Sequence, residues 1–575
     1  MKLTISKSKN SESFYISKSY IDNSGKSTTT TVRKLGTLAE LIVEHGPTRD
    51  DVIAWCRAEV AAETQKYKQA RNAKSVQVIF HADKELDYSQ RKLFEGGYLF
   101  PQAIYYKLQL DKICKKIKQR HQYEYDLNAI MSDLVYNRIL DPRSKLSAYK
   151  AAQSYLETPT YELHDVYRAL SVLAEESDFI QAEVFKNSNY IGKRNDRILY
   201  YDCSNFYFEI EQEEGNKKYG KSKEHRPNPI IQMGLFIDGD GIPLAFSTFA
   251  GNQNEQTSLK PLESKILQQF GHEKFIYCSD AGLGSTSNRK FNHTGERAFI
   301  VTQSIKKLDA ENKKLALNKE GFKRLSDKKN ISAEDMETTD SDELFYKEIP
   351  YVSGGIDQLI IITYSPKYAA YQKAIRDAQV ERAKAMIKTG SLKKNRKNPN
   401  DPARFVGKDA CTKDGEVADI HYYLDEQKVS DEEKYDGLYA VCTDLIDDEV
   451  GDILKVSEGR WQIEECFRIM KTDFSARPVY VRREDRIQAH FLICFLALLI
   501  YRLLEKQLDN KYTCEEILEK LKSMKFADIK GQGYMPTYMR DKLTDALHKT
   551  CGFKTDYEFI TKADMRTIEK MSKQR

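Results

Sequence analysis

The sequence predicts an α/β protein that contains a sheet of mixed strand direction, a mainly helical region before it and further segments around it. Three observations predict this class. Between about 196 and 302, short apolar runs of strand length alternate with turn residues and one helical segment. From about 102 to 186, apolar residues recur at helical spacing. With 575 residues the chain is long enough for three or four domains, so the sheet is expected to be one part of several.

Apolar runs bounded by turn residues define the strands expected in this sheet. The sequence Asp238-Gly-Asp-Gly241 joins two of the runs and is typical of a hairpin turn. A helix is expected over 257–270, between two further runs. A hairpin followed by alternating helix and strand indicates both parallel and antiparallel neighbours. The runs are Ile198–Cys203, Ile231–Ile237, Ile242–Phe249, Lys274–Asp280 and Phe299–Thr302.

Two regions precede the sheet. Residues 1–100 are expected to form an α+β region with a hairpin that turns at Asn23-Ser24-Gly25. Residues 101–190 are expected to form a helical, DNA-binding region. Five basic residues crowd one of its helices, and a solvated face and a DNA-contacting face explain them about equally well. These residues are Lys112, Lys115, Lys116, Lys118 and Arg120.

The sheet domain is expected to be interrupted. Its first part covers 191–303 and its second part 436–510, with an insertion over 304–435 that holds lysine-rich and acidic stretches and some strands. A helix in the insertion ends in the basic run Lys393–Lys397, which reads as a solvated face or a DNA contact. The remaining 511–575 are expected to be helical, because Thr513 and Glu516 form a capping box before an apolar run.

Composition excludes several classes of protein. The formal charge of +5 is too slight by itself to indicate a nucleic-acid partner. The ten cysteines stand singly without a CxxC pair, which offers neither a zinc ribbon nor a thioredoxin-like motif. The first residues lack the apolar core of an export signal, so a cytoplasmic location is expected. The longest apolar run, Phe491–Tyr501, is 11 residues and predicts a buried core helix rather than a membrane span.

Two acids follow apolar strands. Asp202 and Asp280 each end a predicted strand. In α/β sheets the carboxyl ends of strands border the crevice where ligands bind. For either residue alone, an ordinary turn or cap aspartate is an equal alternative. Two such acids in one predicted domain favour a functional site.

A third acid, Glu464, lies on a predicted helix with a charged stripe. At about 100° per residue, the four charged residues fall within roughly 80° of one another, beside an apolar stripe. Charge that borders the buried side fits a helix lining an active cleft. The alternative is an ordinary amphipathic helix in which Glu464 and Arg468 form an i,i+4 pair. The charged residues are Arg460, Glu464, Arg468 and Lys471.

The three acids predict a metal site. Three carboxylates at one point repel one another, and Mg²⁺, with Mn²⁺ as a substitute, prefers such oxygen ligands. Two ions would activate a water or a 3′-hydroxyl and stabilise the leaving oxygen in phosphodiester displacement. Arg460 and Lys471 would then neutralise backbone phosphates. Trp461 beside the stripe is expected to pack against other side chains of the protein. Stacking on an extruded DNA base is the more specific functional alternative.

Several blocks together point to one family. Arg460, Glu464 and Lys471 fit the spacing Tyr-x2-Arg-x3-Glu-x6-Lys, with Ser457 at the tyrosine position. Asp202 stands in YYDCSNFYFE and Asp280 in YCSDAGLGS, and the hairpin block between them ends in GNQNE. In these blocks, over roughly 190–305 and 435–510, the sequence resembles the DDE transposases of bacterial insertion sequences, in the branch that carries this signature.

The resemblance implies a ribonuclease-H-like catalytic domain interrupted by a partly β insertion. It implies Asp202, Asp280 and Glu464 as catalytic metal ligands for two Mg²⁺ ions. It also implies a cut-and-paste reaction in which inverted-repeat ends are nicked and the 3′-hydroxyl attacks target DNA. Such enzymes act as dimers on paired ends, with terminal regions bound to the repeats.

Two other functions stay open. One is a transposase-derived DNA-binding protein without catalysis, and the other is a nuclease of the same fold that only hydrolyses. Nucleotide binding is disfavoured, although Gly215–Ser222 satisfies a P-loop pattern, because Pro227 and Pro229 oppose the helix that this motif requires. A solvated loop is the preferred interpretation, and DNA contact by Lys221 and the nearby Lys223 is the functional role expected of it.

Overall fold

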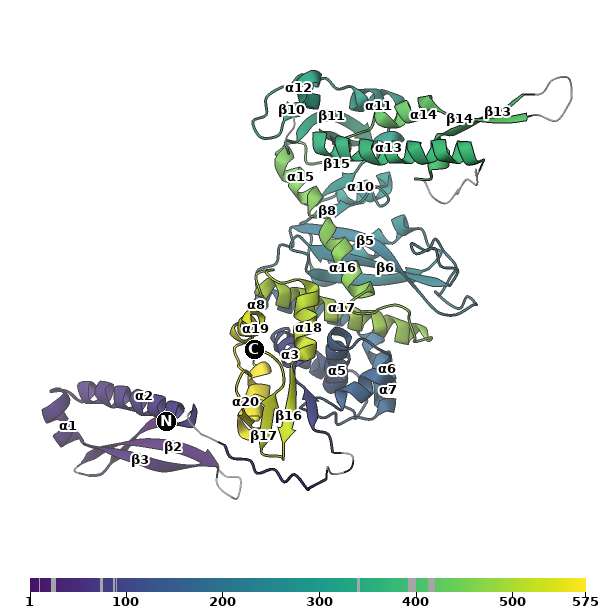
Figure 1. Ribbon diagram of the computed structural model, residues 1–575. Coiled ribbons are helices and arrows are strands. Elements are labelled where there is room, and N and C mark those ends of the chain that lie inside the picture. The colour runs from purple at the N-terminus through teal and green to yellow at the C-terminus, as the bar shows by residue number, and fades with distance from the viewer. Residues whose placement is uncertain are drawn as a thin grey trace. The chain divides into compact units, whose positions relative to one another are not determined.

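The computed structural model describes residues 1–9, 11–21, 27–72, 76–85, 88, 90–338, 342–390, 400–411 and 419–574 (Figure 1). The chain folds into two compact units, Met1–Tyr88 and Ser89–Arg575. Each unit has its own apolar core, and each is described by itself.

The first unit is a three-stranded antiparallel sheet with two helices. Thr37 caps the first helix, and Glu40 completes the capping box. Its small core is made of Phe14, Leu41, Val52 and Cys56. The two long strands form the expected pair, whereas the turn predicted at 23–25 lies outside the described residues. The elements are β1 (Lys2–Lys7), β2 (Glu12–Ile21), β3 (Ser27–Thr37), α1 (Leu38–His45) and α2 (Arg49–Asn72).

The second unit begins with the expected helices. Basic residues on the second of them point outward, and two are already paired: Lys116 with Glu183 and Arg120 with Glu176. These pairs favour a solvated face for part of the basic cluster, and DNA contact by the rest stays a prediction. The helices are α3 (Leu99–Lys107), α4 (Leu110–Lys118), α5 (Leu127–Leu140), α6 (Lys145–Ala152), α7 (Leu163–Glu175) and α8 (Ser177–Ile191).

A nine-stranded mixed sheet forms the centre of this unit. The strand order is β10-β11-β12-β15-β9-β8-β5-β6-β7. β8 pairs in parallel with both β5 and β9, and the other neighbours are antiparallel, as expected from the strand pattern. The strands are β5 (Ile198–Tyr207), β6 (Ile230–Asp238), β7 (Pro243–Ala250), β8 (Ile276–Ser279), β9 (Ala298–Thr302), β10 (Lys323–Arg324), β11 (Phe345–Ser353), β12 (Ile356–Tyr364) and β15 (Leu438–Thr443).

The segment predicted as an insertion, 304–435, extends this sheet. Its strands β10, β11 and β12 continue the sheet beyond β15, because β12 pairs with β15 over Leu359–Tyr364. The basic run Lys393–Lys397 lies outside the described residues. Figure 1 shows the separate ribbon β13–β14 beyond the helices of this segment. The other elements here are α11 (Ala310–Leu317), α12 (Ala333–Thr338), α13 (Pro366–Thr389), β13 (Val406–Cys411), β14 (Asp419–Leu424) and α14 (Glu426–Glu433).

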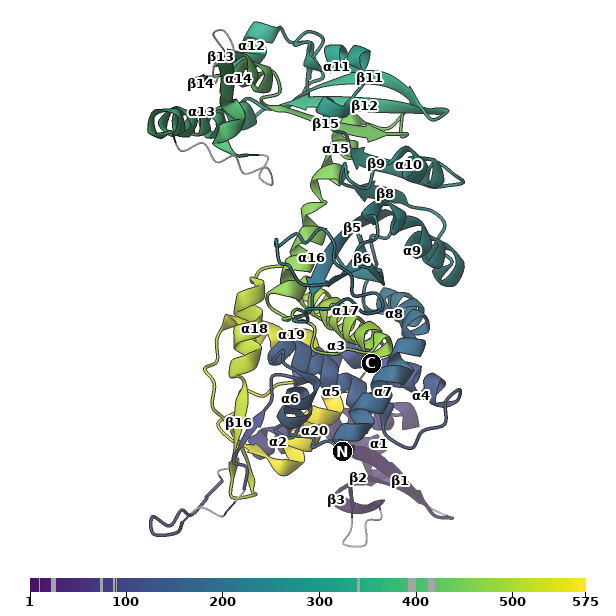
Figure 2. The same cartoon turned by 90° about the vertical axis from the view of Figure 1, so that its right-hand side faces the viewer.

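Two short helices pass along one face of the sheet. α15 (Val450–Glu458) contacts β8 and β9, and α16 (Trp461–Lys471) contacts β5 and β6 (Figure 2). The helix predicted around Glu464 is α16, and the structure separates it from α15 at Gly459. A Cβ there would lie 2.2 Å from the hydroxyl of Tyr200, so glycine lets the helix ends approach β5.

The helix α17 (Glu484–Gln507) passes through the core of the second unit. By length and composition it is apolar enough to cross a membrane, but almost all of it is buried inside the protein. It contacts α3, α5, α7 and β7, which explains why it is apolar on every side. The prediction of a buried core helix over Phe491–Tyr501 is confirmed.

The C-terminal segment is helical only in part. Its short strands join β4 (Leu93–Glu95) in a second sheet of order β18-β17-β16-β4. The sequence reading missed these strands because their partner lies more than 400 residues away in the chain. The capping box of Thr513 and Glu516 is confirmed. The elements are α18 (Cys514–Ser523), β16 (Lys525–Ile529), β17 (Gly533–Pro536), α19 (Lys542–Cys551), β18 (Ile560–Thr561) and α20 (Lys562–Ser572).

Candidate active site

Asp202 and Asp280 stand beside each other across two parallel strands. In the β5–β8 ladder Tyr200 is the partner of Cys278, and each aspartate lies two residues further on. Neighbouring strands are about 4.8 Å apart, and alternation places both acids on the face of Tyr200 and Cys278. One prediction needs correction: Asp202 does not end its strand, because β5 continues to Tyr207 along β6. It stands just past the part of β5 that pairs with β8.

The charges of the two acids are coupled. Burial and, to a smaller extent, the negative charge of Asp280 raise the pKa of Asp202 to about 6, while Lys223 opposes the rise. Asp280 is exposed, and one of its oxygens accepts a hydrogen bond from the backbone of Leu283 at 3.0 Å. Two acids side by side, one of them half-buried, therefore form an electronegative edge at the carboxyl end of β8.

A third acid near Asp202 is Glu255, which the sequence reading did not single out. Its charge also raises the pKa of Asp202. Lys223 links the two, since its ammonium lies 3.7 Å from Glu255 and donates to the carbonyl of Cys203. The available signal was an acid in the block Gly251-Asn-Gln-Asn-Glu255, directly after β7. Lys223 and Glu255 also line a cavity of about 930 Å³, together with Lys221.

The helix α16 begins near the end of β9 and ends near Asp202. At its start, Arg460 donates to the hydroxyl of Thr302 at 2.6 Å. At its end, burial and the charge of Lys223 lower the pKa of Lys471 to about 8, and Asp202 opposes this fall. The predicted charged stripe thus lies against the face that carries both aspartates.

Glu464 lies on this stripe between Arg460 and Lys471. It is exposed and lines a cavity of about 280 Å³ together with Arg460, Trp461 and Ser457. Within the described part of the chain, Glu464 has no hydrogen-bond or ion-pair partner. The structure therefore brings Asp202, Asp280 and Lys471 into one electrostatic neighbourhood, and it shows no contact between Glu464 and either aspartate.

The other predicted residues occupy different positions. Arg468 pairs with Glu465 at 2.7 Å and with Asp473 at 3.1 Å, so the alternative pair with Glu464 does not form. Trp461 is 60% exposed and is not a packing residue in this structure.

Two further polar residues, Asp238 and His490, serve the fold. Asp238 is fully buried, pairs with Arg194 and accepts two turn amides, which confirms its hairpin role. His490 is buried and bonds the carbonyl of Ala476 at 3.0 Å.

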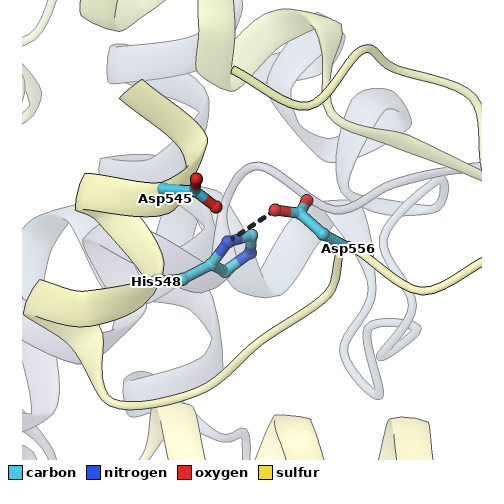
Figure 3. A group of neighbouring side chains, drawn as sticks. All are labelled: Asp545, His548 and Asp556. Carbon is cyan, nitrogen blue, oxygen red and sulfur yellow. Dashed lines mark ion pairs between the residues drawn. The ribbon is translucent and has the colours of Figure 1, made fainter. Parts of the chain in front are cut away.

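One group in the described chain has three potential metal ligands within 4.8 Å of one another: Asp545, His548 and Asp556 (Figure 3). Nε2 of His548 accepts the backbone N–H of Thr555 at 3.1 Å, so the neutral ring carries its proton on Nδ1. That nitrogen lies 3.0 Å from Asp556. Asp545 is held by Arg540 at 2.9 Å. Asp545 thus has an arginine partner and His548 faces Asp556, which makes the group a structural network of side-chain contacts.

Comparison with known proteins gives one clear match. The family model for the transposase DDE domain matches residues 194–500. Among curated proteins, none matches the chain. A cryo-EM structure of a piggyBac transposase synaptic complex with hairpin DNA aligns over 83% of this chain and 90% of that one, with 7% identity and a TM-score of 0.36, too distant to bear on function. Because the matched segment covers more than half of the chain and contains Asp202, Asp280 and Glu464, the protein belongs to the transposase DDE domain family.

Proposed function

We propose that this protein is an active DNA transposase of the insertion-sequence type with the signature described above. It cleaves DNA strands at inverted-repeat ends and joins the 3′-hydroxyl ends to target DNA. The observation that carries the proposal is that Asp202 and Asp280 lie near each other just past the paired part of β5 and β8, where the charge of Asp280 acts on Asp202. The antiparallel strands β5–β7, extended in parallel by β8 and β9, support a ribonuclease-H-like centre.

The acids fit a divalent cation. Both aspartates offer only oxygen, the ligand atom that Mg²⁺ prefers, with Mn²⁺ as a substitute. Burial is the main cause of the raised pKa of Asp202, and the charge of Asp280 adds a repulsion that a bound cation would relieve. Two bound Mg²⁺ ions would supply an activated water or 3′-hydroxyl and stabilise the leaving oxygen. Asp202 and Asp280 would hold the ions from the sheet, and Glu464 would join them from α16.

The surrounding cations would hold the DNA strand. Lys471 lies beside Asp202 and, with a pKa of about 8, is mostly protonated at neutral pH. Lys223 and Lys221 line the cavity of about 930 Å³ that also contains Glu255. Arg460, Arg468 and the exposed face of Trp461 extend this surface along α16. The protein would act as a cytoplasmic homodimer on paired ends, with terminal regions bound to the repeats.

Three substitutions test the catalytic assignment. Asp202→Asn, Asp280→Asn and Glu464→Gln should each abolish metal-dependent cleavage of DNA that carries the element ends, while binding to those ends persists. Glu458→Gln is a matched control, because this exposed acid lines the same small cavity as Glu464. Cleavage that survives any of the three substitutions contradicts the assignment.

A DNA-binding protein without catalysis is the second candidate. It is favoured by Ser457 at the tyrosine position and by the separation of Glu464 from the two aspartates in this structure. Metal-dependent nicking of a supercoiled plasmid that carries the ends would exclude it. Joining of a 3′-hydroxyl end to target DNA would likewise exclude a nuclease that only hydrolyses.

A further inference from the structure

A second cationic cavity lies between the helical region and the segment that joins α16 to α17. Its volume is about 430 Å³. Arg138 from α5, Arg143 and Lys145 from the start of α6, and Arg477 line it. Across the described residues, no aspartate or glutamate lines this cavity. Four cations around one hollow without a lining acid point to an anion.

Lys145 is the decisive residue. Its side chain is only 5% exposed, and it has no hydrogen-bond or ion-pair partner among the described residues. Burial and the charge of Arg138 lower its pKa to about 7. An unpaired buried ammonium is costly, so such groups are normally paired or bind a ligand. An anion in the cavity would raise this pKa and keep the lysine charged.

Arg138 is a second buried cation that no carboxylate neutralises in the described structure. It is 5% exposed, and its Nη1 donates to the carbonyls of Phe474 and Ser475 at 2.9 and 3.2 Å. Its Nε is buried without a partner in the described structure. The two carbonyls fix the guanidinium beside the cavity but leave its full charge without a carboxylate.

The other two arginines are already matched by acids outside the lining. Arg143 pairs with Asp141 at 2.8 Å on the surface, and Arg477 pairs with Glu224. The start of α6 adds partial positive charge, since the first backbone N–H groups of a helix point outward. Ser144 is the N-cap residue, and its hydroxyl accepts a hydrogen bond from the backbone N–H of Ser147. The positive charges that no acid matches at this cavity are therefore those of Arg138 and of Lys145 when it is protonated.

Its position relates this cavity to the acids of the proposed active site. Arg477 pairs with Glu224, the neighbour of Lys223, and Lys223 bonds the carbonyl of Cys203 beside Asp202. The wall of the cavity is thus joined to the acid site by direct contacts. We propose that this cavity binds one backbone phosphate of the DNA strand that crosses the site, with Lys145 and Arg138 as its ligands. This rests on the proposed function for the identity of the ligand, since a free phosphate shares the same chemistry.

Lys145→Met tests the site, with Lys150→Met as its control. Both remove one positive charge from α6, but Lys150 is exposed. Thermal unfolding is measured in inorganic phosphate against chloride of equal ionic strength. Phosphate should raise the melting temperature of the wild type and of Lys150→Met, but not that of Lys145→Met. In phosphate-free buffer Lys145→Met should be at least as stable as the wild type, because it removes an unpaired buried charge.

Binding of the metal-free protein to a short random-sequence duplex then distinguishes a DNA phosphate from a free one. The magnitude of the slope of the logarithm of the binding constant against the logarithm of the salt concentration should decrease by about one in Lys145→Met, as for one lost phosphate contact. It should not change in Lys150→Met. Arg143→Gln, at the rim, should weaken both responses without touching the core.

An unchanged phosphate response in Lys145→Met overturns the site. A lost phosphate response with an unchanged salt slope overturns its assignment to DNA. Neither readout uses cleavage, so cleavage that survives Asp202→Asn would remove the proposed function while the result at Lys145 still stands.

Discussion

Lys471 lies close enough to Asp202 for the aspartate to oppose the fall in the pKa of the lysine. The last turn of α16 is therefore placed over β5, where the two aspartates meet. This proximity therefore brings the charged stripe, which helical spacing predicted, next to the acids that the strand pattern predicted.

The first prediction concerns Lys471. Replacing it by Met should reduce DNA cleavage by about 10- to 100-fold, because hydrogen bonds to charged groups contribute roughly 1.5–3 kcal/mol. Lys455→Met, on the exposed side of α15, should leave the rate near wild type. Single-turnover cleavage at fixed Mg²⁺ measures both. Equal rates for Lys471→Met and wild type would remove the lysine from the site.

The second prediction concerns the pH dependence of stability without metal. The pKa of Asp202 is raised to about 6, so the folded state holds its proton more tightly than the unfolded state. This contribution to stability is present below about pH 4 and is lost as the pH rises through 6. In EDTA, the free energy of unfolding of Asp202→Asn relative to that of the wild type should therefore rise by about 1–3 kcal/mol between pH 4 and pH 7. Urea unfolding at the two pH values measures the gain, and a constant difference contradicts it.

The third prediction separates two acids. The negative charge of Glu255 raises the pKa of Asp202, whereas Glu464 stands at the glutamate position of the signature in the sequence. Glu464→Gln should abolish cleavage, and Glu255→Gln should change it only a few-fold, since removing a repulsive charge alters the pKa of Asp202 without removing a ligand. The reverse result would make Glu255 the third acid. Cleavage assays over a series of Mg²⁺ concentrations decide between them.

The fourth prediction concerns the break between α15 and α16. In Gly459→Ala the new methyl would lie 2.2 Å from the Tyr200 hydroxyl, which donates to the carbonyl of Val456 at 2.9 Å. Loss of this fit should lower the free energy of unfolding by about 1–3 kcal/mol. Gly451→Ala lies within α15 and its new methyl would have no heavy atom within 4 Å, so it should be neutral or stabilising by up to about 1 kcal/mol. Chemical denaturation compares the two, and equal effects would show that the close approach is unimportant.

Local patterns were sufficient for much of the fold. Apolar runs predicted the strands around Asp202 and Asp280, and the long apolar run predicted the buried helix α17. These predictions succeeded because strand alternation, turn residues and burial act over neighbouring residues. The short strands β16–β18 escaped them, because their sheet includes β4 from a distant part of the chain.

By itself, the sequence determined the acids, the signature spacing around Glu464 and the mixed α/β class of this protein. Only the tertiary structure decided that Asp202 aligns with Asp280, that Glu255 shares their electrostatic environment, and that Lys145 is buried without a partner. The physical reason is that charge coupling and desolvation depend on distance through space. Strand register and helix packing set that distance, and residue spacing along the chain does not.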